Sequence, residues 1–240
     1  MTEKYEKNIY LAMLAEQCSR FEDMMNFLEE MVIGKSEDLS SDERNLLSIA
    51  YKNTISLRRT AVRTLLAYQM KEQKKTESHY LPFIMEYKAK VEEELIKLCQ
   101  RVISIIDTHL LPRAKENESK VFYYKMKGDY YRYIAENVEG ELKKANSDNS
   151  LKAYNDAGEF EKNLPCADPI RLGLALNKSV FYYEVFNDSE SAIKIAKETL
   201  DMARNELQGV DEDDEQYRDA FAIINLIQEN LNMWTVDMEN

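Results

Sequence analysis

The sequence predicts an all-α protein of about nine antiparallel helices. The 240 residues include 6 Gly and 4 Pro, and because tight hairpin turns rely on these two residue types, few β-hairpins are expected. A charged fraction of 32% beside a hydrophobic fraction of 44% is typical of long amphipathic helices in a globular chain. Apolar residues recur at helical spacing along most of the chain, without a linker or a fixed repeat period. We therefore expect one domain over residues 1–240.

The helices of the first half are placed by apolar stripes and by residues that begin or end helices. Gly34 is expected to cap the C-terminus of the second helix. Ser40, with Asp42 and Glu43 in the turn that follows, is expected to cap the third helix. The fourth helix should end before Pro112. The expected ranges are 3–19, 21–32, 42–74 and 80–110.

Five further helices are expected in the second half. Pro169 fits the first turn of a helix, where its missing N–H costs nothing. That helix should end at 187–189, which would cap the next one, and 209–214 should form an acidic loop. A bend is expected in the sixth helix at 146–149. The expected ranges are 119–137, 140–164, 169–187, 190–208 and 215–236.

Charge and cysteine content narrow the class of protein. A net charge of −12 argues against general affinity for nucleic acid, and against a polybasic membrane contact. Cys18, Cys99 and Cys166 are far apart and odd in number, which favours reduced thiols over a disulfide framework. The charged N-terminus does not resemble a secretory signal, and no apolar run approaches the roughly 20 residues of a membrane span. A cytoplasmic protein is predicted.

Two basic stripes stand out against this acidic background. Lys52, Arg59 and Arg63 point within about 40° of one another on a helix, with no acidic residue among them. Lys125 and Arg132 are seven residues apart on a later helix. Such stripes are more often solvated surfaces with i,i+4 pairs. Guanidinium groups nevertheless suit bidentate phosphate contacts, so a compact dianion such as a phosphate ester is the favoured ligand. The adjacent Tyr133 would add a hydroxyl donor.

Two later helices each carry a mostly apolar face that contains one asparagine. Such a face can hold an extended peptide, because the Asn side chain offers a donor and an acceptor to the peptide backbone. Taken alone, these residues are more simply read as ordinary core. They are Leu176, Asn177, Val180 and Glu184 on the first helix, and Ile223, Leu226, Asn230, Met233 and Trp234 on the second.

Catalysis is disfavoured by the residues present. His79 and His109 are 30 residues apart, and neither has a companion at ligand spacing. The sequence contains no Gly-rich phosphate loop, no HExxH motif and no nucleophile elbow. We expect no enzyme activity, no metal site and no cofactor. The alternative kept open is a helical-repeat scaffold that binds unmodified peptides.

The chain resembles the 14-3-3 proteins over nearly its whole length. The resemblance rests on long, ordered motifs at 14–17, 44–48, 51–53, 118–123, 125–133, 169–177 and 219–234. It implies a nine-helix protomer with a concave amphipathic groove, paired into a cup-shaped homodimer or heterodimer. It also implies an adaptor that captures client proteins phosphorylated on serine or threonine, a type of recognition known to use Arg clusters.

The resemblance assigns roles to three parts of the chain. Residues 1–34 would supply dimerisation helices, 41–137 the basic pocket and 169–236 the apolar and amide wall. The phosphate would be bound by Lys52, Arg59, Arg132 and Tyr133, supported by Arg63 and Lys125. The peptide would contact Asn177, Glu184, Asn230, Trp234, Leu176, Val180, Ile223 and Leu226. Between subunits, Arg20 would pair with Glu94 and Asp23 with Lys90, beside the apolar contacts of Leu14, Cys18, Leu65 and Tyr87.

Several positions depart from the family pattern. Val62 stands where tryptophan is usual, and Ala61 replaces a serine whose phosphorylation weakens some dimers, so that switch should be missing. Lys178 replaces an aromatic residue beside Asn177 and is expected to add a cation near the groove. Met233 replaces a leucine. The segment 137–149 is also unusual, and the variable acidic tail is expected to be short or absent.

Overall fold

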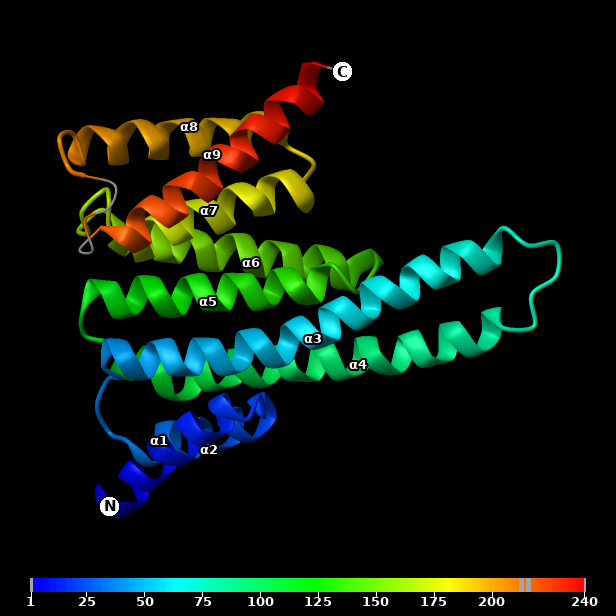
Figure 1. Cartoon of the computed structure of the whole chain (residues 1–240), viewed down its shortest axis with the longest axis horizontal. Coiled ribbons are helices and arrows are strands. Elements are labelled where there is room, and N and C mark those ends of the chain that lie inside the picture. Colours follow the sequence, from blue (N-terminus) through cyan, green and yellow to red (C-terminus); the bar gives the residue numbers. More distant parts are fainter. Residues whose placement is uncertain (1, 212–213, 215–216, 240) are drawn as a thin grey trace. The chain divides into compact units, whose positions relative to one another are not determined.

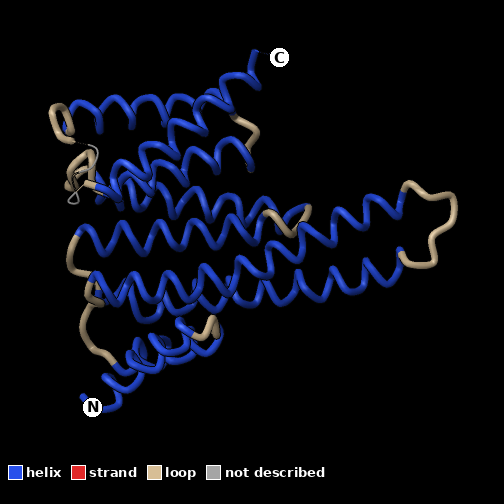
Figure 2. The backbone as a smooth tube through the Cα atoms, in the orientation of Figure 1, coloured by secondary structure: helices blue, strands red, loops and turns tan. Residues whose placement is uncertain are grey.

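The computed structural model describes residues 2–211, 214 and 217–239. Within these residues the chain forms helices and no strand, which confirms the all-α prediction (Figures 1 and 2). The chain divides into two compact units, residues 1–114 and 115–240. The single domain over 1–240 stays a prediction. None of the described helices is both long enough and apolar enough to span a bilayer.

The first unit contains two helical pairs. The helices are α1 (Thr2–Gln17), α2 (Phe21–Gly34), α3 (Ser41–Gln73) and α4 (Leu81–Ile105). Helices α3 and α4 run side by side, and α1 packs on α2 (Figure 1). Beyond α4 the coil continues as a π-helix (Ile106–Leu110) and a 3-10 helix (Leu111–Arg113). The helical coil therefore continues three residues beyond the expected end at 110. Pro112 lies in this last irregular turn and has no backbone N–H to donate.

Two caps were predicted in this unit, one at the end of α2 and one at the start of α3. The Ser40 backbone N–H donates to Glu43 Oε2 at 2.7 Å, and the Glu43 N–H donates to Ser40 Oγ at 3.3 Å. This capping box confirms the expected start of α3. The expected cap at Gly34 is wrong by one residue. Gly34 is the last residue of α2, and Lys35 occupies the cap position with φ −91°, so no left-handed residue is needed there.

A buried polar contact ties α2, α3 and α4 together inside an apolar core. The Tyr51 hydroxyl on α3 donates to Glu29 on α2, and Arg101 Nε on α4 donates to Glu29 Oε2 at 2.8 Å. Burial raises the pKa of the Tyr51 phenol, and the nearby Glu29 carboxylate raises it further. Tyr51 therefore remains a neutral hydrogen-bond donor in the folded unit. Met24, Leu28, Leu47, Ile55 and Leu95 are fully buried residues of the same three helices.

The second unit contains α5 (Asn117–Ala135), α6 (Gly140–Glu161), α7 (Pro169–Glu184), α8 (Ser189–Glu206) and α9 (Arg218–Glu239). Pro169 begins α7 and Asp188 caps α8, both as expected, and Asp168 caps α7, which was not predicted. Helix α6 is continuous through 146–149. The expected start of α9 at 215 lies outside the described residues, as does part of the expected 209–214 loop.

Helices α5 and α6 pack tightly against each other at Gly128. Ser150 Oγ on α6 donates to the Gly128 carbonyl at 2.8 Å. A Cβ atom at position 128 would lie 2.5 Å from the ring of Tyr154, which is fully buried. Position 128 therefore requires glycine because a side chain would collide with Tyr154, and not because the backbone φ angle is positive. This close approach brings the Tyr154 hydroxyl to the charged face of α5.

Candidate functional site

The centre of the charged site in the second unit is Arg132 on α5. Arg132 is 5% exposed. Its guanidinium nitrogens lie 3.2 Å from the carboxylate of Glu136, 3.7 Å from that of Asp129 and 3.8 Å from that of Glu184. Its Nε donates to the Tyr154 hydroxyl at 3.4 Å. The guanidinium carbon also lies 4.7 Å from the centre of the Tyr133 ring, within the range of a cation–π contact.

These neighbours decide the charge of the buried arginine. Burial would lower the pKa of Arg132, but Tyr154, Tyr133, Asp129 and Glu136 together raise it well above its ordinary value. Arg132 is therefore a permanently charged group enclosed by protein. Burial also raises the pKa of the Tyr154 phenol, with the Asp129 carboxylate next in importance. Tyr154 thus stays protonated and serves as a donor.

Asp129 connects the other polar groups of the site. It accepts hydrogen bonds from the Tyr154 hydroxyl at 2.6 Å and from Asn177 Nδ2 at 2.8 and 2.9 Å. Lys125 Nζ approaches the same carboxylate at 3.4 Å. The structure thus gathers residues from α5, α6 and α7 around one buried acid. Five residues predicted to bind ligand lie in this cluster: Lys125, Arg132, Tyr133, Asn177 and Glu184.

Sequence reasoning assigned no role to Asp129 or Tyr154. Asp129 could have been found, because its spacing from Lys125 (i+4) and Arg132 (i−3) places it on the same helix face. Tyr154 carries no comparable signal, since it lies 22 residues from Arg132 on another helix. Its role follows from the packing of α6 on α5.

In the first unit, the predicted basic stripe lies along α3. Lys52 and Arg63 are exposed, and Arg59 is half-buried. Among the described residues, Lys52 and Arg63 have no carboxylate within 4 Å. Arg58 differs from Lys52 and Arg63, because it pairs with Glu22 on α2 and lies 3.8 Å from Glu94 on α4. Lys52 and Arg63 therefore present positive charge at the surface of this unit.

The predicted apolar wall lies on α7 and α9 of the second unit. Leu176, Val180, Ile223 and Asn230 are half-buried, and Leu226 is exposed. Trp234 is 1% exposed and stacks on Tyr183, with ring centres 5.1 Å apart. Its indole Nε1 is buried and has no hydrogen-bond partner among the described residues. Met233 is exposed on the same helix.

The residues predicted for the dimer contact lie mostly on the surface of the first unit. Leu14, Cys18, Arg20, Tyr87, Lys90 and Glu94 are exposed, while Asp23 and Leu65 are half-buried. Arg20 pairs with Asp23 in its own chain. Both residues border a hollow of about 280 Å³ with Leu57 and Arg58. Pairing between subunits stays a prediction.

Three departures from the family pattern have distinct settings. Val62 is buried and Ala61 is half-buried on α3. Lys178 lies next to Asn177 in sequence, but its Nζ donates to Asn155 Oδ1 at 3.0 Å, away from the Asp129 cluster. In the described part of the chain there is no group of three or more His, Cys, Asp or Glu residues placed to hold a metal ion.

Comparison with known proteins identifies the family. A family model described as "14-3-3 protein" matches residues 11–235. The chain is 45% identical to "Checkpoint signal transducer rad25" of Schizosaccharomyces pombe over 240 residues, covering 100% of this chain and 88% of the relative. It is also 45% identical to "Protein BMH2" of Saccharomyces cerevisiae, covering 99% and 87%. It is 44% identical to "14-3-3-like protein B" of Hordeum vulgare, covering 97% and 89%. The helical-repeat scaffold is therefore not favoured. The chain belongs to the 14-3-3 family of phosphopeptide-binding adaptor proteins.

Proposed function

We propose that this chain captures client proteins phosphorylated on serine or threonine, and that Lys52, Arg59, Arg132 and Tyr133 contact the phosphoryl group. The observation that carries the proposal is the buried, charged Arg132. Its three carboxylate neighbours lie 3.2 to 3.8 Å away. Charge-assisted hydrogen bonds are shorter, about 2.7–2.9 Å. A phosphate dianion could therefore offer Arg132 better contacts than its own protein does.

Recognition would depend on charge rather than on a reaction. A phosphoryl group adds about −1.5 to −2 charges and three acceptor oxygens. Arg59 and Arg132 would contact those oxygens, Tyr133 would donate a hydroxyl, and Lys52, Arg63 and Lys125 would add positive potential. An unphosphorylated peptide would bring no dianion to these clustered cations, which is the proposed basis of selectivity.

The client backbone would be held by polar groups with spare hydrogen-bonding capacity. In support, Asn177 Nδ2 is engaged by Asp129, which leaves its amide oxygen to accept a peptide N–H. The buried Trp234 Nε1 is a donor whose pairing would relieve a desolvation cost. Asn230 and Glu184 would contribute further polar contacts. Client side chains would lie against Leu176, Val180, Ile223 and Leu226.

We further propose that two copies, or this chain and a related one, form a dimer through helices in 1–34 and parts of 41–137. Exposed Leu14 and Tyr87, 43% and 58% accessible, supply apolar area for such a contact together with Cys18 and Leu65. Arg20 would exchange its Asp23 partner for Glu94 of the partner subunit, and Asp23 would pair with Lys90 of the partner subunit. A dimer could engage two phosphorylated sites on one client and so raise avidity.

The remaining parts of the proposal concern setting and chemistry. We propose an adaptor without enzymatic turnover, acting in the cytoplasm and without nucleic-acid partners. Three free cysteines accord with a reducing compartment, and the net charge of −12 opposes binding to polyanions. Residues 1–240 would act as one domain, with the wall in 169–236.

Charge reversal on α3 tests the phosphate site. Lys52→Glu should abolish binding of a phosphoserine peptide that carries Arg upstream and Pro downstream of the phosphorylated residue. Lys71→Glu is the matched control, because it makes the same charge change on another face of α3. Binding is measured by fluorescence anisotropy, with the unphosphorylated peptide as the reference. Helicity is measured by circular dichroism. Retained binding by a folded Lys52→Glu variant would refute the assignment.

A further inference from the structure

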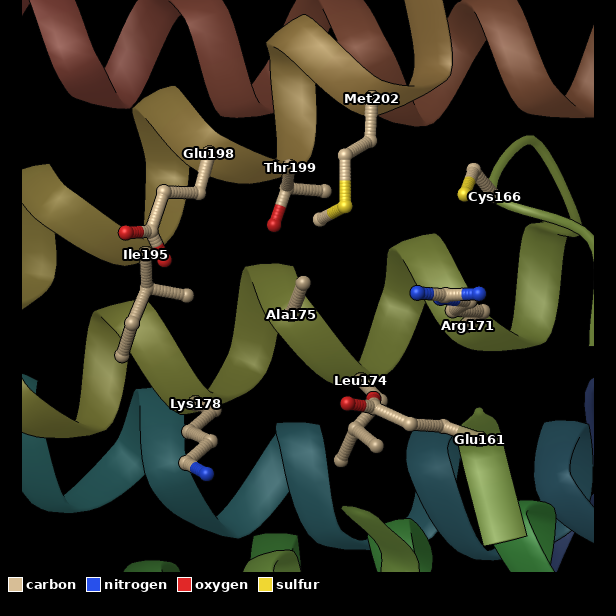
Figure 3. Close-up of a pocket in the computed structure, with 10 residues that line it drawn as sticks. All are labelled: Glu161, Cys166, Arg171, Leu174, Ala175, Lys178, Ile195, Glu198, Thr199 and Met202. Carbon is tan, nitrogen blue, oxygen red and sulfur yellow. The ribbon is translucent and has the colours of Figure 1, made fainter. Parts of the chain in front are cut away.

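A cavity of about 170 Å³ lies between α7 and α8 in the second unit. Figure 3 shows Arg171, Leu174, Ala175 and Lys178 on α7, with Glu198, Thr199 and Met202 on α8 across from them. On α7 these residues point almost opposite to Asn177, Val180 and Glu184, because each residue turns the helix by about 100°. The cavity is therefore separate from the peptide-binding face of the proposed function.

Two cations, Arg171 and Lys178, border this cavity beyond ion-pair distance from the carboxylates of the described residues. Arg171 Nη1 donates to the Leu164 carbonyl at 2.7 Å, and Lys178 Nζ donates to Asn155 Oδ1 at 3.0 Å. Within the described residues, neither group has a carboxylate within 4 Å. Both are half-buried in a chain of net charge −12, where acidic partners are plentiful. Neutral oxygens satisfy some of their donors, and the Glu161 carboxyl acts on both charges from beyond ion-pair distance.

The rest of the lining is largely apolar. Leu174, Ala175, Ile195 and Met202 supply hydrocarbon surface beside the two cations. Since one water takes about 30 Å³ of liquid volume, the space suits a small organic molecule better than a lone inorganic ion. We propose that this cavity binds a small carboxylate with an apolar aliphatic or aromatic body, its carboxylate facing Lys178 and Arg171.

Two acidic residues also border the cavity. Glu198 lies at the exposed rim, and its carboxylate is 4.0 Å from Lys194 Nζ. Burial raises the pKa of the Glu161 carboxyl, against the opposing effects of Arg171, Lys178 and Lys162. Protonated Glu161 can donate a hydrogen bond to a bound carboxylate, whereas ionised Glu161 repels it. Glu161→Gln, which keeps a hydrogen-bond donor and removes the negative charge, should therefore tighten carboxylate binding at neutral pH.

Methyl NMR of the full chain tests the proposal directly. The protein is labelled at the methionine methyl groups, and the Met202 signal is assigned with a Met202→Leu variant. Benzoate should shift the Met202 signal saturably, with a dissociation constant on the order of 1 mM or tighter. Benzyl alcohol and benzylammonium have a similar apolar body without the negative charge, so neither should produce a saturable shift.

Matched variants separate the effect of the Lys178 charge on binding from the effect of the cavity volume. Lys178→Gln should weaken benzoate binding by about tenfold or more, because a charge-assisted hydrogen bond is lost. Lys197→Gln removes an exposed lysine of α8 outside the cavity and should have no effect. Ala175→Leu should fill the space and abolish binding, while phosphopeptide affinity and helicity stay at wild-type values. An unmoved Met202 signal, equal shifts with benzyl alcohol, or full binding by Lys178→Gln would each overturn the proposal.

Discussion

Replacing Gly128 by alanine should destabilise the second unit, although alanine is the better helix former. The new Cβ would lie 2.5 and 2.6 Å from two ring carbons of Tyr154, distances that real Cβ atoms do not tolerate. Tyr154 is fully buried, so its ring can move only by displacing packed neighbours. Its hydroxyl would then lose the 2.6 Å hydrogen bond to Asp129.

The size of the effect follows from three opposing contributions. Gly→Ala inside a helix gains about 1 kcal/mol. Overpacking a core costs typically about 1–3 kcal/mol, and loss of a hydrogen bond to a charged group costs about 1.5–3 kcal/mol. The free energy of unfolding should therefore fall by about 1.5–5 kcal/mol. Phosphopeptide affinity should fall as well, because Tyr154 also contacts Arg132.

Gly158→Ala on α6 is the matched control. A Cβ there would find no atom closer than Glu161 Oε1 at 4.0 Å, so only the helix-propensity gain of about 1 kcal/mol should remain. Urea unfolding followed by circular dichroism measures both variants. The reasoning fails if Gly128→Ala unfolds at the wild-type urea concentration or above it.

Three further predictions concern other parts of the chain. Ser40→Ala should lower the free energy of unfolding by about 1 kcal/mol through loss of the capping box, as measured by urea titration; an unchanged midpoint would contradict this role. Burial raises the phenol pKa of Tyr51 and of Tyr154. Stability should thus be constant below the unfolded pKa of about 10, then fall above it by up to about 1.4 kcal/mol per pH unit for each phenol. Urea midpoints from pH 8 to 11 measure this, and a flat profile would argue against buried neutral phenols. Leu14→Glu should shift the proposed dimer to monomer in analytical ultracentrifugation at unchanged helicity, and a persistent dimer would exclude Leu14 from the interface.

Helix positions were predictable because local signals agree with the packing. Among the described residues, apolar periodicity placed the α-helices to within about five residues at each end, and Ser40, Asp168 and Asp188 each cap a helix. The C-terminal cap of α2 was predicted at Gly34, one residue too early. The chain leaves α2 at Lys35 in an extended conformation that any residue adopts. The irregular turn between 106 and 113 has no periodic signature in the sequence.

The candidate site was predictable only along single helices. The spacing of Lys125 and Arg132 indicated a shared face, and the structure places both beside Asp129. Tyr154 could not be found, because its contact depends on how α6 packs against α5. Lys178 was expected near the groove through its neighbour Asn177. One residue of helix rotation instead directs it toward Asn155 and the cavity between α7 and α8.

The stacked pair of Trp234 and Tyr183 gives this protein a natural optical probe. Trp234 is the sole tryptophan in the sequence, so its emission reports one location. Its indole N–H is shielded from solvent and has no acceptor among the residues that the structure describes, so it is sensitive to any carbonyl that approaches it. Docking of a client backbone should therefore change the emission of unlabelled protein. Affinities of phosphorylated peptides that lack tryptophan can then be read without attaching a dye to either molecule.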